Sequence, residues 1–222
     1  MILRSLCPAL WIIVGAGVSQ AQSAARNEDL PRAFRSVAGV ELNRDSAISI
    51  QAKLGMAGPS GVRAGHDKYL SWCYRSGDGA AAVTLELMSD ASDMGTAGHE
   101  LNVIRLRSDV PTTQPNGCGQ LAPQMPLSTA GGLRLGLAPA AVAALLGSPS
   151  HHAGDSLVFA FVSKEYMARS SREYATWNTP KYRKDCFGGG EPFVDVGATV
   201  TVHFRDQHAI EIRLERYDQS TC

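Results

Sequence analysis

The segment GLRLGLAPAAVAALLGSPSHHAGDSLVFAF, residues 132–161, contains a helix, both of its ends and the strand that follows it. Pro139 suits the first turn of a helix, where its missing N–H removes no hydrogen bond. Val142, Leu145 and Leu146 recur at helical spacing, and Gly147 follows at the position where a left-handed cap is favoured. The segment therefore predicts a short amphipathic helix that packs against an apolar strand.

A weaker copy of this segment comes earlier in the chain, as GVELNRDSAISIQAKLGMAGPSGVRAGHDKYLSWCY, residues 39–74. Both copies contain, in the same order, a glycine with an apolar pair, a short helix, Leu-Gly, a Pro-Ser turn, a glycine followed by aspartate, and an apolar strand. A repeated order of this kind indicates an internal duplication.

Strands are predicted after each helix. Residues 199–204 alternate apolar and polar side chains, as do residues 210–215 beyond a polar turn, which is typical of a half-buried antiparallel hairpin. The first half alternates in the same way at residues 83–87, and a further strand is predicted at residues 101–107 after a longer loop. The tripeptide Ile-Arg-Leu ends both halves, at residues 104–106 and 212–214. Each half is therefore predicted to be a helix followed by three or four antiparallel strands, and residues 30–37 are expected to add a short helix in front.

Residues 132–161 resemble the BamE/SmpA-like family of small bacterial envelope proteins. In that family a Gly-x-x-x-Gly-(Met/Leu)-x-x-x-x-Val-x-x-x-Leu-Gly-x-Pro segment leads into a Gly-Asp turn and an aromatic strand. A tandem of two such units is similar to the arrangement in β-lactamase inhibitory protein. The resemblance implies an α+β fold of two tandem helix-plus-antiparallel-sheet repeats, with the helices on one face of a continuous sheet. It also implies a role in binding other proteins, without catalysis.

The N-terminus predicts export. Arg4, an uncharged apolar run over residues 6–18 and the small residues Ser19 and Ala21 are typical of a signal peptide, residues 1–21, cleaved before Gln22. The apolar run is short for a membrane span, so no stable membrane anchor is expected after cleavage, although an uncleaved anchor is the alternative. The expected location is periplasmic or secreted, and the two halves are placed at residues 22–118 and 119–222.

Four cysteines follow the predicted cleavage site, and an oxidising compartment favours two disulfides. The duplication predicts one in each half, Cys73–Cys118 and Cys186–Cys222. The chain has 21 basic and 21 acidic residues, so it has no single-sign field to attract nucleic acid. Nucleic acid is therefore not an expected partner.

A catalytic or metal site is not indicated by any complete motif, and neither a metal nor a cofactor is expected. The chain has no Gly-x-Ser-x-Gly elbow and no phosphate-binding loop. His151, His152, Asp155 and His203 could form a metal-dependent hydrolase site, because imidazole and carboxylate suit zinc. A solvated loop is the simpler interpretation of the first three.

Aromatic residues provide the candidate binding surface. Those on the strand after each helix either pack in the core or form an exposed protein-binding patch. The insertion of residues 164–185 has six basic and three acidic residues and is rich in the Tyr, Trp and Arg that are common at interface hot spots. The leading hypothesis is an exported non-catalytic protein that binds an envelope protein, and a small-ligand or lipid carrier is a further alternative. The candidate partner-binding residues are Trp72, Tyr74, Phe159, Phe161, Tyr174 and Trp177.

Overall fold

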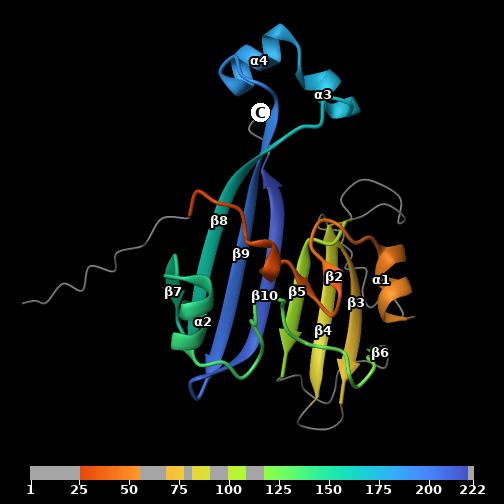
Figure 1. The fold of residues 1–222 in the computed structure, drawn as a ribbon, viewed down its shortest axis with the longest axis vertical. Coiled ribbons are helices and arrows are strands. Elements are labelled where there is room, and N and C mark those ends of the chain that lie inside the picture. The colour runs from red at the N-terminus through yellow and green to blue at the C-terminus, as the bar shows by residue number, and fades with distance from the viewer. Residues whose placement is uncertain (1–25, 56–68, 78–81, 91–99, 109–117, 220–222) are drawn as a thin grey trace, which may run out of the picture.

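The computed structural model describes residues 26–55, 69–77, 82–90, 100–108 and 118–219 (Figure 1). The predicted signal peptide and its cleavage site lie outside these ranges. Among the described residues, no helix has the length and apolar character needed to cross a membrane.

A single eight-stranded sheet dominates the fold, with the strand order β6-β3-β4-β5-β10-β9-β8-β7. Neighbouring strands are antiparallel, except that β6 runs parallel to β3. The strands are β3 (Tyr69–Ser76), β4 (Val83–Asp90), β5 (Val103–Arg107), β6 (Gly119–Gln120), β7 (His151–Ala153), β8 (Ser156–Tyr166), β9 (Phe193–Arg205) and β10 (His208–Gln219).

The two Ile-Arg-Leu tripeptides lie opposite each other at the centre of the sheet. β5 pairs with β10 so that Arg105 is directly across from Arg213, with an isoleucine facing a leucine on either side. Side chains of a strand alternate between its two faces. The four aliphatic side chains of the tripeptides are buried in the core, and both arginines are on the opposite face. The last strands of the two halves therefore form the seam between them.

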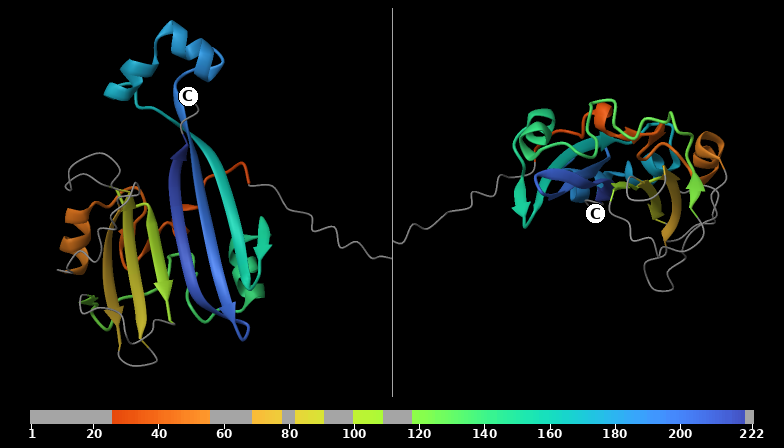
Figure 2. Two further views of the ribbon diagram at one scale, coloured as in Figure 1. Left: turned by 180° about the vertical axis from the view of Figure 1, so that it is seen from behind. Right: turned by 90° about the horizontal axis from the view of Figure 1, so that it is seen from below.

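Two helices cover one face of the sheet, α1 (Ala47–Leu54) and α2 (Pro139–Leu146) (Figure 2). Each packs two apolar residues into the core, Ile50 and Leu54 from α1 and Val142 and Leu146 from α2. Each also ends at a glycine with positive φ, which only glycine adopts readily. The α+β class with helices on one face of a continuous sheet is thus confirmed.

The segment before α1 is less helical than predicted. Only η1 (Arg32–Phe34) is helical, as a single 3₁₀ turn. The chain then forms β1 (Ser36–Val37) and β2 (Val40–Glu41), which pair in a separate small sheet. Pro31 precedes the 3₁₀ turn as expected, but positive φ angles at Ala38 and Gly39 turn the chain back into the hairpin.

The predicted terminal hairpin is present as β9 and β10, with one local difference. Asp206 and Gln207 form its turn, and both have positive φ. A two-residue hairpin loop needs positive φ at both positions for its twist to match that of the strands. The register shifts between Ala209 and Glu211. Because of this bulge, Ala209 occupies the core position that the alternation assigned to Ile210, and Ile210 is only partly buried.

The predicted disulfide Cys73–Cys118 is present. Cys73 lies on β3, and Cys118 directly precedes β6, so the bond attaches β6 next to its parallel partner. Cys186 is also disulfide-bonded. Its predicted partner, Cys222, lies outside the described residues, and that pairing stays a prediction.

Candidate functional site

Four of the candidate partner-binding residues are core residues. Trp72, Tyr74, Phe159 and Phe161 are between 0% and 3% exposed and belong to one hydrophobic cluster beneath the helices. Tyr74 also donates its hydroxyl hydrogen to the Gly55 carbonyl, 3.1 Å away. Of the two interpretations, packing in the core holds, because these side chains are buried between the sheet and its helices. The interpretation as an exposed binding patch is wrong for these four residues.

Of the four residues considered for a metal-dependent site, His152, Asp155 and His203 line one hollow, described below, and His151 is not among its lining residues. His151 and His152 are exposed on the edge strand β7, and Asp155 is in the exposed turn before β8. His203, on β9, is within 2.5 Å of the Ser156 hydroxyl through its Nδ1. Within the described ranges, no group of three or more His, Cys, Asp or Glu side chains is placed to hold a metal ion.

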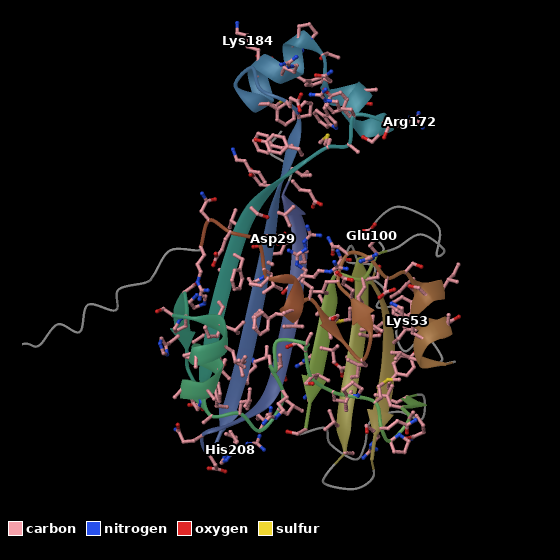
Figure 3. All side chains as sticks on the ribbon, viewed as in Figure 1. Asp29, Lys53, Glu100, Arg172, Lys184 and His208 are labelled. Carbon is pink, nitrogen blue, oxygen red and sulfur yellow. A yellow bond between two sulfur atoms is a disulfide. The ribbon has the colours of Figure 1, made fainter. Side chains whose placement is uncertain are left out.

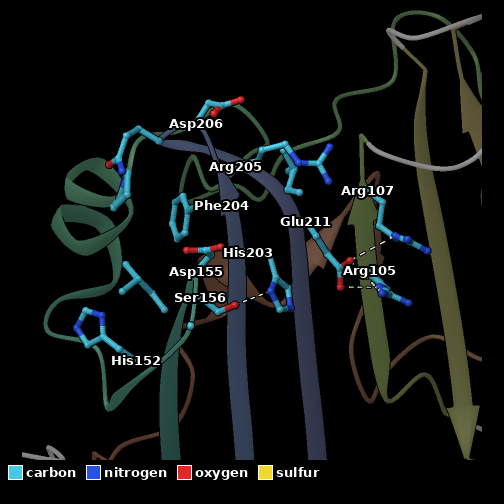
Figure 4. Close-up of a pocket in the computed structure, with 15 residues that line it drawn as sticks. Arg105, Arg107, His152, Asp155, Ser156, His203, Phe204, Arg205, Asp206 and Glu211 are labelled. Atoms are coloured by element: carbon cyan, nitrogen blue, oxygen red, sulfur yellow. Dashed lines mark hydrogen bonds and ion pairs between the residues drawn. The ribbon is translucent and has the colours of Figure 1, made fainter. Parts of the chain in front are cut away.

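A hollow of about 890 Å³ lies at the end of the sheet that carries the β9–β10 turn (Figure 4). Its floor is a row of side chains that runs across neighbouring strands on the face away from α1 and α2. Register places Ser156 beside His203, His203 beside Glu211, and Glu211 beside Arg107. The hollow therefore takes its residues from both halves of the chain.

On the β5 side of this hollow, two arginines are paired with two glutamates. Arg105 donates to both carboxylate oxygens of Glu211, at 2.8 and 2.9 Å, and to Glu86 at 3.3 Å. Arg107 lies 3.3 Å from Glu211 and 3.7 Å from Glu86. Burial acts to lower the pKa of Arg105, but the two glutamates outweigh it, so this pKa lies above its ordinary value. The arrangement is a cross-strand ion-pair network that joins the two halves.

A second candidate site is the segment between β8 and β9, which extends beyond the end of the sheet (Figure 1). We call residues 164–193 the arm, a range that includes the last residues of β8 and the first residue of β9. It contains α3 (Arg172–Trp177) and α4 (Pro180–Phe187). Ser171 accepts a hydrogen bond from the Tyr174 amide at 2.9 Å, and Thr179 accepts one from the Tyr182 amide at 3.4 Å. Each helix thus starts at a hydroxyl cap.

The arm has a small aromatic core of its own. Phe187 packs edge-to-face on Phe193, with ring centroids 5.4 Å apart, and Tyr166 packs on the same Phe193 ring at 6.1 Å. Trp177 packs on Tyr182 at 5.0 Å. Edge-to-face pairs of this kind are a favoured aromatic geometry. The arm is therefore a structured element that still leaves large aromatic surfaces exposed.

Polar contacts attach the base of the arm to the sheet. Arg216, on β10, donates to the Glu165 carboxylate at 2.7 Å, and its side chain is only 9% exposed. The Met167 amide donates to the Pro192 carbonyl at 3.1 Å and so closes the base.

The remaining predicted site residues, Tyr174 and Trp177, lie on α3, where both are partly exposed. Tyr166 and Tyr182 belong to the insertion that the sequence singled out but not to the listed candidate partner-binding residues, and they are 64% and 38% exposed. Sequence reasoning missed both arm helices. The pair Thr179-Pro180, a capping residue followed by proline, is the helix-start signal that could have located α4.

Comparisons with protein-family models, with curated proteins and with solved structures give no match for this chain. The resemblance of residues 132–161 to BamE/SmpA-like proteins therefore stays a prediction. The structure itself defines a class, an α+β protein with one large antiparallel sheet, helices on one face and a projecting arm.

Proposed function

We propose that this chain is an exported, non-catalytic protein that binds another protein of the cell envelope, and that the arm is its docking element. The observation that carries the proposal is the arm itself, a structured projection that exposes large aromatic side chains. The eight-stranded sheet would serve as the scaffold that holds the arm in place.

The composition and the order of the arm both support this role. Tyr, Trp and Arg dominate interface hot spots, and Tyr166 and Tyr182 are exposed on the arm while Trp177 is partly exposed. Binding with a segment that is already ordered avoids much of the entropy cost of immobilising it. The capped helices and the ring contacts provide that order before any partner arrives.

The proposal extends to the history and location of the protein. A tandem duplication is supported by two halves that each contain a helix followed by antiparallel strands, three after α1 and four after α2. The halves join where their Ile-Arg-Leu tripeptides pair. The Cys73–Cys118 disulfide fits an oxidising compartment outside the cytoplasm. A lipid carrier would need an apolar hollow, whereas the hollow between β8 and β5 is lined mainly by polar and charged side chains, among them Asp155, His203 and Glu211.

A variant without the arm tests the proposal. Tyr166 and Phe193 face each other in the β8–β9 register, so an Asn-Gly turn in place of residues 167–192 would close a two-residue hairpin. Cys222→Ser accompanies this change because the variant lacks Cys186. Chemical crosslinking in envelope extract, followed by mass spectrometry, compares the variant with the unaltered protein.

We expect one or a few envelope proteins to crosslink to the unaltered protein and to be lost from the arm-less variant. Ile48→Ala is the control, because Ile48 is 64% exposed on α1, away from the arm, and it should keep the same crosslinks. Circular dichroism must show that the arm-less variant retains its sheet. A folded arm-less protein that keeps every crosslink would contradict the proposal.

A further inference from the structure

We infer that the partner surface recognised by the arm is acidic. This inference rests on the proposed function and adds the chemistry of the partner. It is drawn from the ion pairing of the charged residues of the arm. Most of its described acidic residues are in ion pairs, whereas several of its basic residues are exposed.

The acidic residues of the arm are mostly used within the protein. Glu165 is bound by Arg216, and Glu191 forms an ion pair with Arg169. Of the acidic arm residues whose side chains are described, Asp185 alone has no ion pair. The arm therefore presents little free negative charge.

Three basic residues of the arm are exposed and unpaired. Arg172, Lys181 and Lys184 form no ion pair or side-chain hydrogen bond with any described residue, and all three are exposed. Lys181 and Lys184 are three residues apart on α4, a spacing that places them on neighbouring parts of the helix surface. Figure 3 shows Lys184 at the end of the arm, pointing away from the sheet, and Arg172 at the side of the arm.

This arrangement differs from that on the sheet. There Arg105 and Arg107 are held between Glu86 and Glu211, so their charge is neutralised locally. An unpaired cation at the tip of a projection keeps its field, and such a field steers an oppositely charged partner and rejects a like-charged one. The charge therefore points to an acidic partner.

A protein surface suits these features better than an anionic membrane. Lipid recognition by basic segments uses clusters of about four to eight Lys or Arg. The arm has six, but three of them are held inside it: Lys164 lies over the Phe193 ring, Arg169 pairs with Glu191, and Arg183 donates to backbone carbonyls. Trp177 packs edge-to-face on Tyr182, so its ring is held within the arm and does not project as a membrane anchor would. Aromatic rings next to Lys and Arg fit a polar protein interface with a few anchoring side chains.

The test measures binding of defined probes to the purified protein by fluorescence anisotropy. The probes are a fluorescein-labelled poly-glutamate peptide, a poly-lysine peptide of equal length, and phosphatidylglycerol vesicles. Binding is measured at about 20 mM and about 150 mM salt, because exposed charges are screened between these limits. Lys184→Glu is compared with Arg134→Glu, since Arg134 is an exposed basic residue outside the arm.

We expect poly-glutamate to bind, poly-lysine not to bind, and the affinity for poly-glutamate to fall as salt rises. Lys184→Glu should weaken poly-glutamate binding about threefold to tenfold, and Arg134→Glu less than about twofold. Equal effects of the two substitutions, or vesicle binding that exceeds peptide binding, would overturn the inference.

The envelope crosslinks separate this inference from the proposed function. If they need the arm but are insensitive to Lys184→Glu and to salt, the arm docks a partner without using its charge, and only the present inference fails. If the crosslinks persist in the arm-less protein, both fail.

Discussion

Asp45 is the buried charge on which the start of α1 depends, and its replacement by alanine should destabilise the fold. The residue is 4% exposed. Its carboxylate accepts hydrogen bonds from the Glu41 amide at 2.7 Å, the Ser49 hydroxyl at 2.8 Å and the Lys53 ammonium at 2.7 Å. These contacts join the β1–β2 hairpin to the first and last turns of α1.

The contacts of Asp45 do not contribute equally. The side chain of Lys53 is 42% exposed, so water replaces its lost partner and the pair itself contributes little. Ser49 keeps a second acceptor, the Ser46 carbonyl at 3.0 Å. The Glu41 amide loses the carboxylate, which costs about 1–3 kcal/mol, and loss of a negative charge at a helix N-terminus adds about 0.3–1 kcal/mol. We expect Asp45→Ala to lower the free energy of unfolding by about 2–4 kcal/mol.

The effect of Asp45 should depend on pH. Burial acts to raise the pKa of Asp45, but the hydrogen bonds from Lys53, the Glu41 amide and Ser49 together lower it below its ordinary value of 3.8. A folded-state pKa below the unfolded one stabilises the protein above the unfolded value, and this stabilisation is lost as pH falls through the folded value. The difference between the unaltered protein and Asp45→Ala should therefore be constant at neutral pH and shrink below about pH 4.

Urea unfolding followed by circular dichroism between about pH 2.5 and pH 7 measures this difference. In thermal unfolding at neutral pH, followed by the same signal, the melting temperature should fall by about 5–10 °C. Asp185→Ala is the control, since that aspartate is exposed on α4 and its loss should leave the melting temperature almost unchanged. A loss below about 0.5 kcal/mol for Asp45→Ala, or a difference that persists undiminished at the lowest pH, would refute the reasoning.

Three further substitutions test the packing, each by denaturant unfolding. Cys73→Ser removes the bond to Cys118 and should lower the free energy of unfolding by about 2–4 kcal/mol; an equal stability of the reduced and oxidised unaltered protein would argue against this. Gly131→Ala places a methyl group against the Phe34 ring and should cost about 1–3 kcal/mol, with no loss expected if the ring simply swings away. Phe159→Ala, at a fully buried position, should cost about 3–5 kcal/mol, and a value near 1 kcal/mol would mean that the core collapses around the gap.

Local sequence signals determined the elements that they lie within. The spacing of Val142 and Leu146 between Pro139 and Gly147 located α2, and the alternation on either side of the polar turn located the β9–β10 hairpin. The duplication predicted Cys73–Cys118. These predictions succeeded because a cap, a periodic face or a turn depends on residues only a few positions apart.

Tertiary structure decided which surface of each element is free and which elements become neighbours. The two copies of the repeat predict that Trp72, on β3, and Phe159, on β8, share one face of the sheet. Only the packing of α1 and α2 on that face made it the core. The pairing of β5 with β10 brings together side chains that no local pattern relates. The ion pair of Arg216 with Glu165, which are 51 residues apart in the chain, does the same. The free energy of such contacts comes from burial and charge pairing between distant segments. For this reason the exposed surface of the arm could be identified only from the tertiary structure, whereas local patterns predict helices and strands.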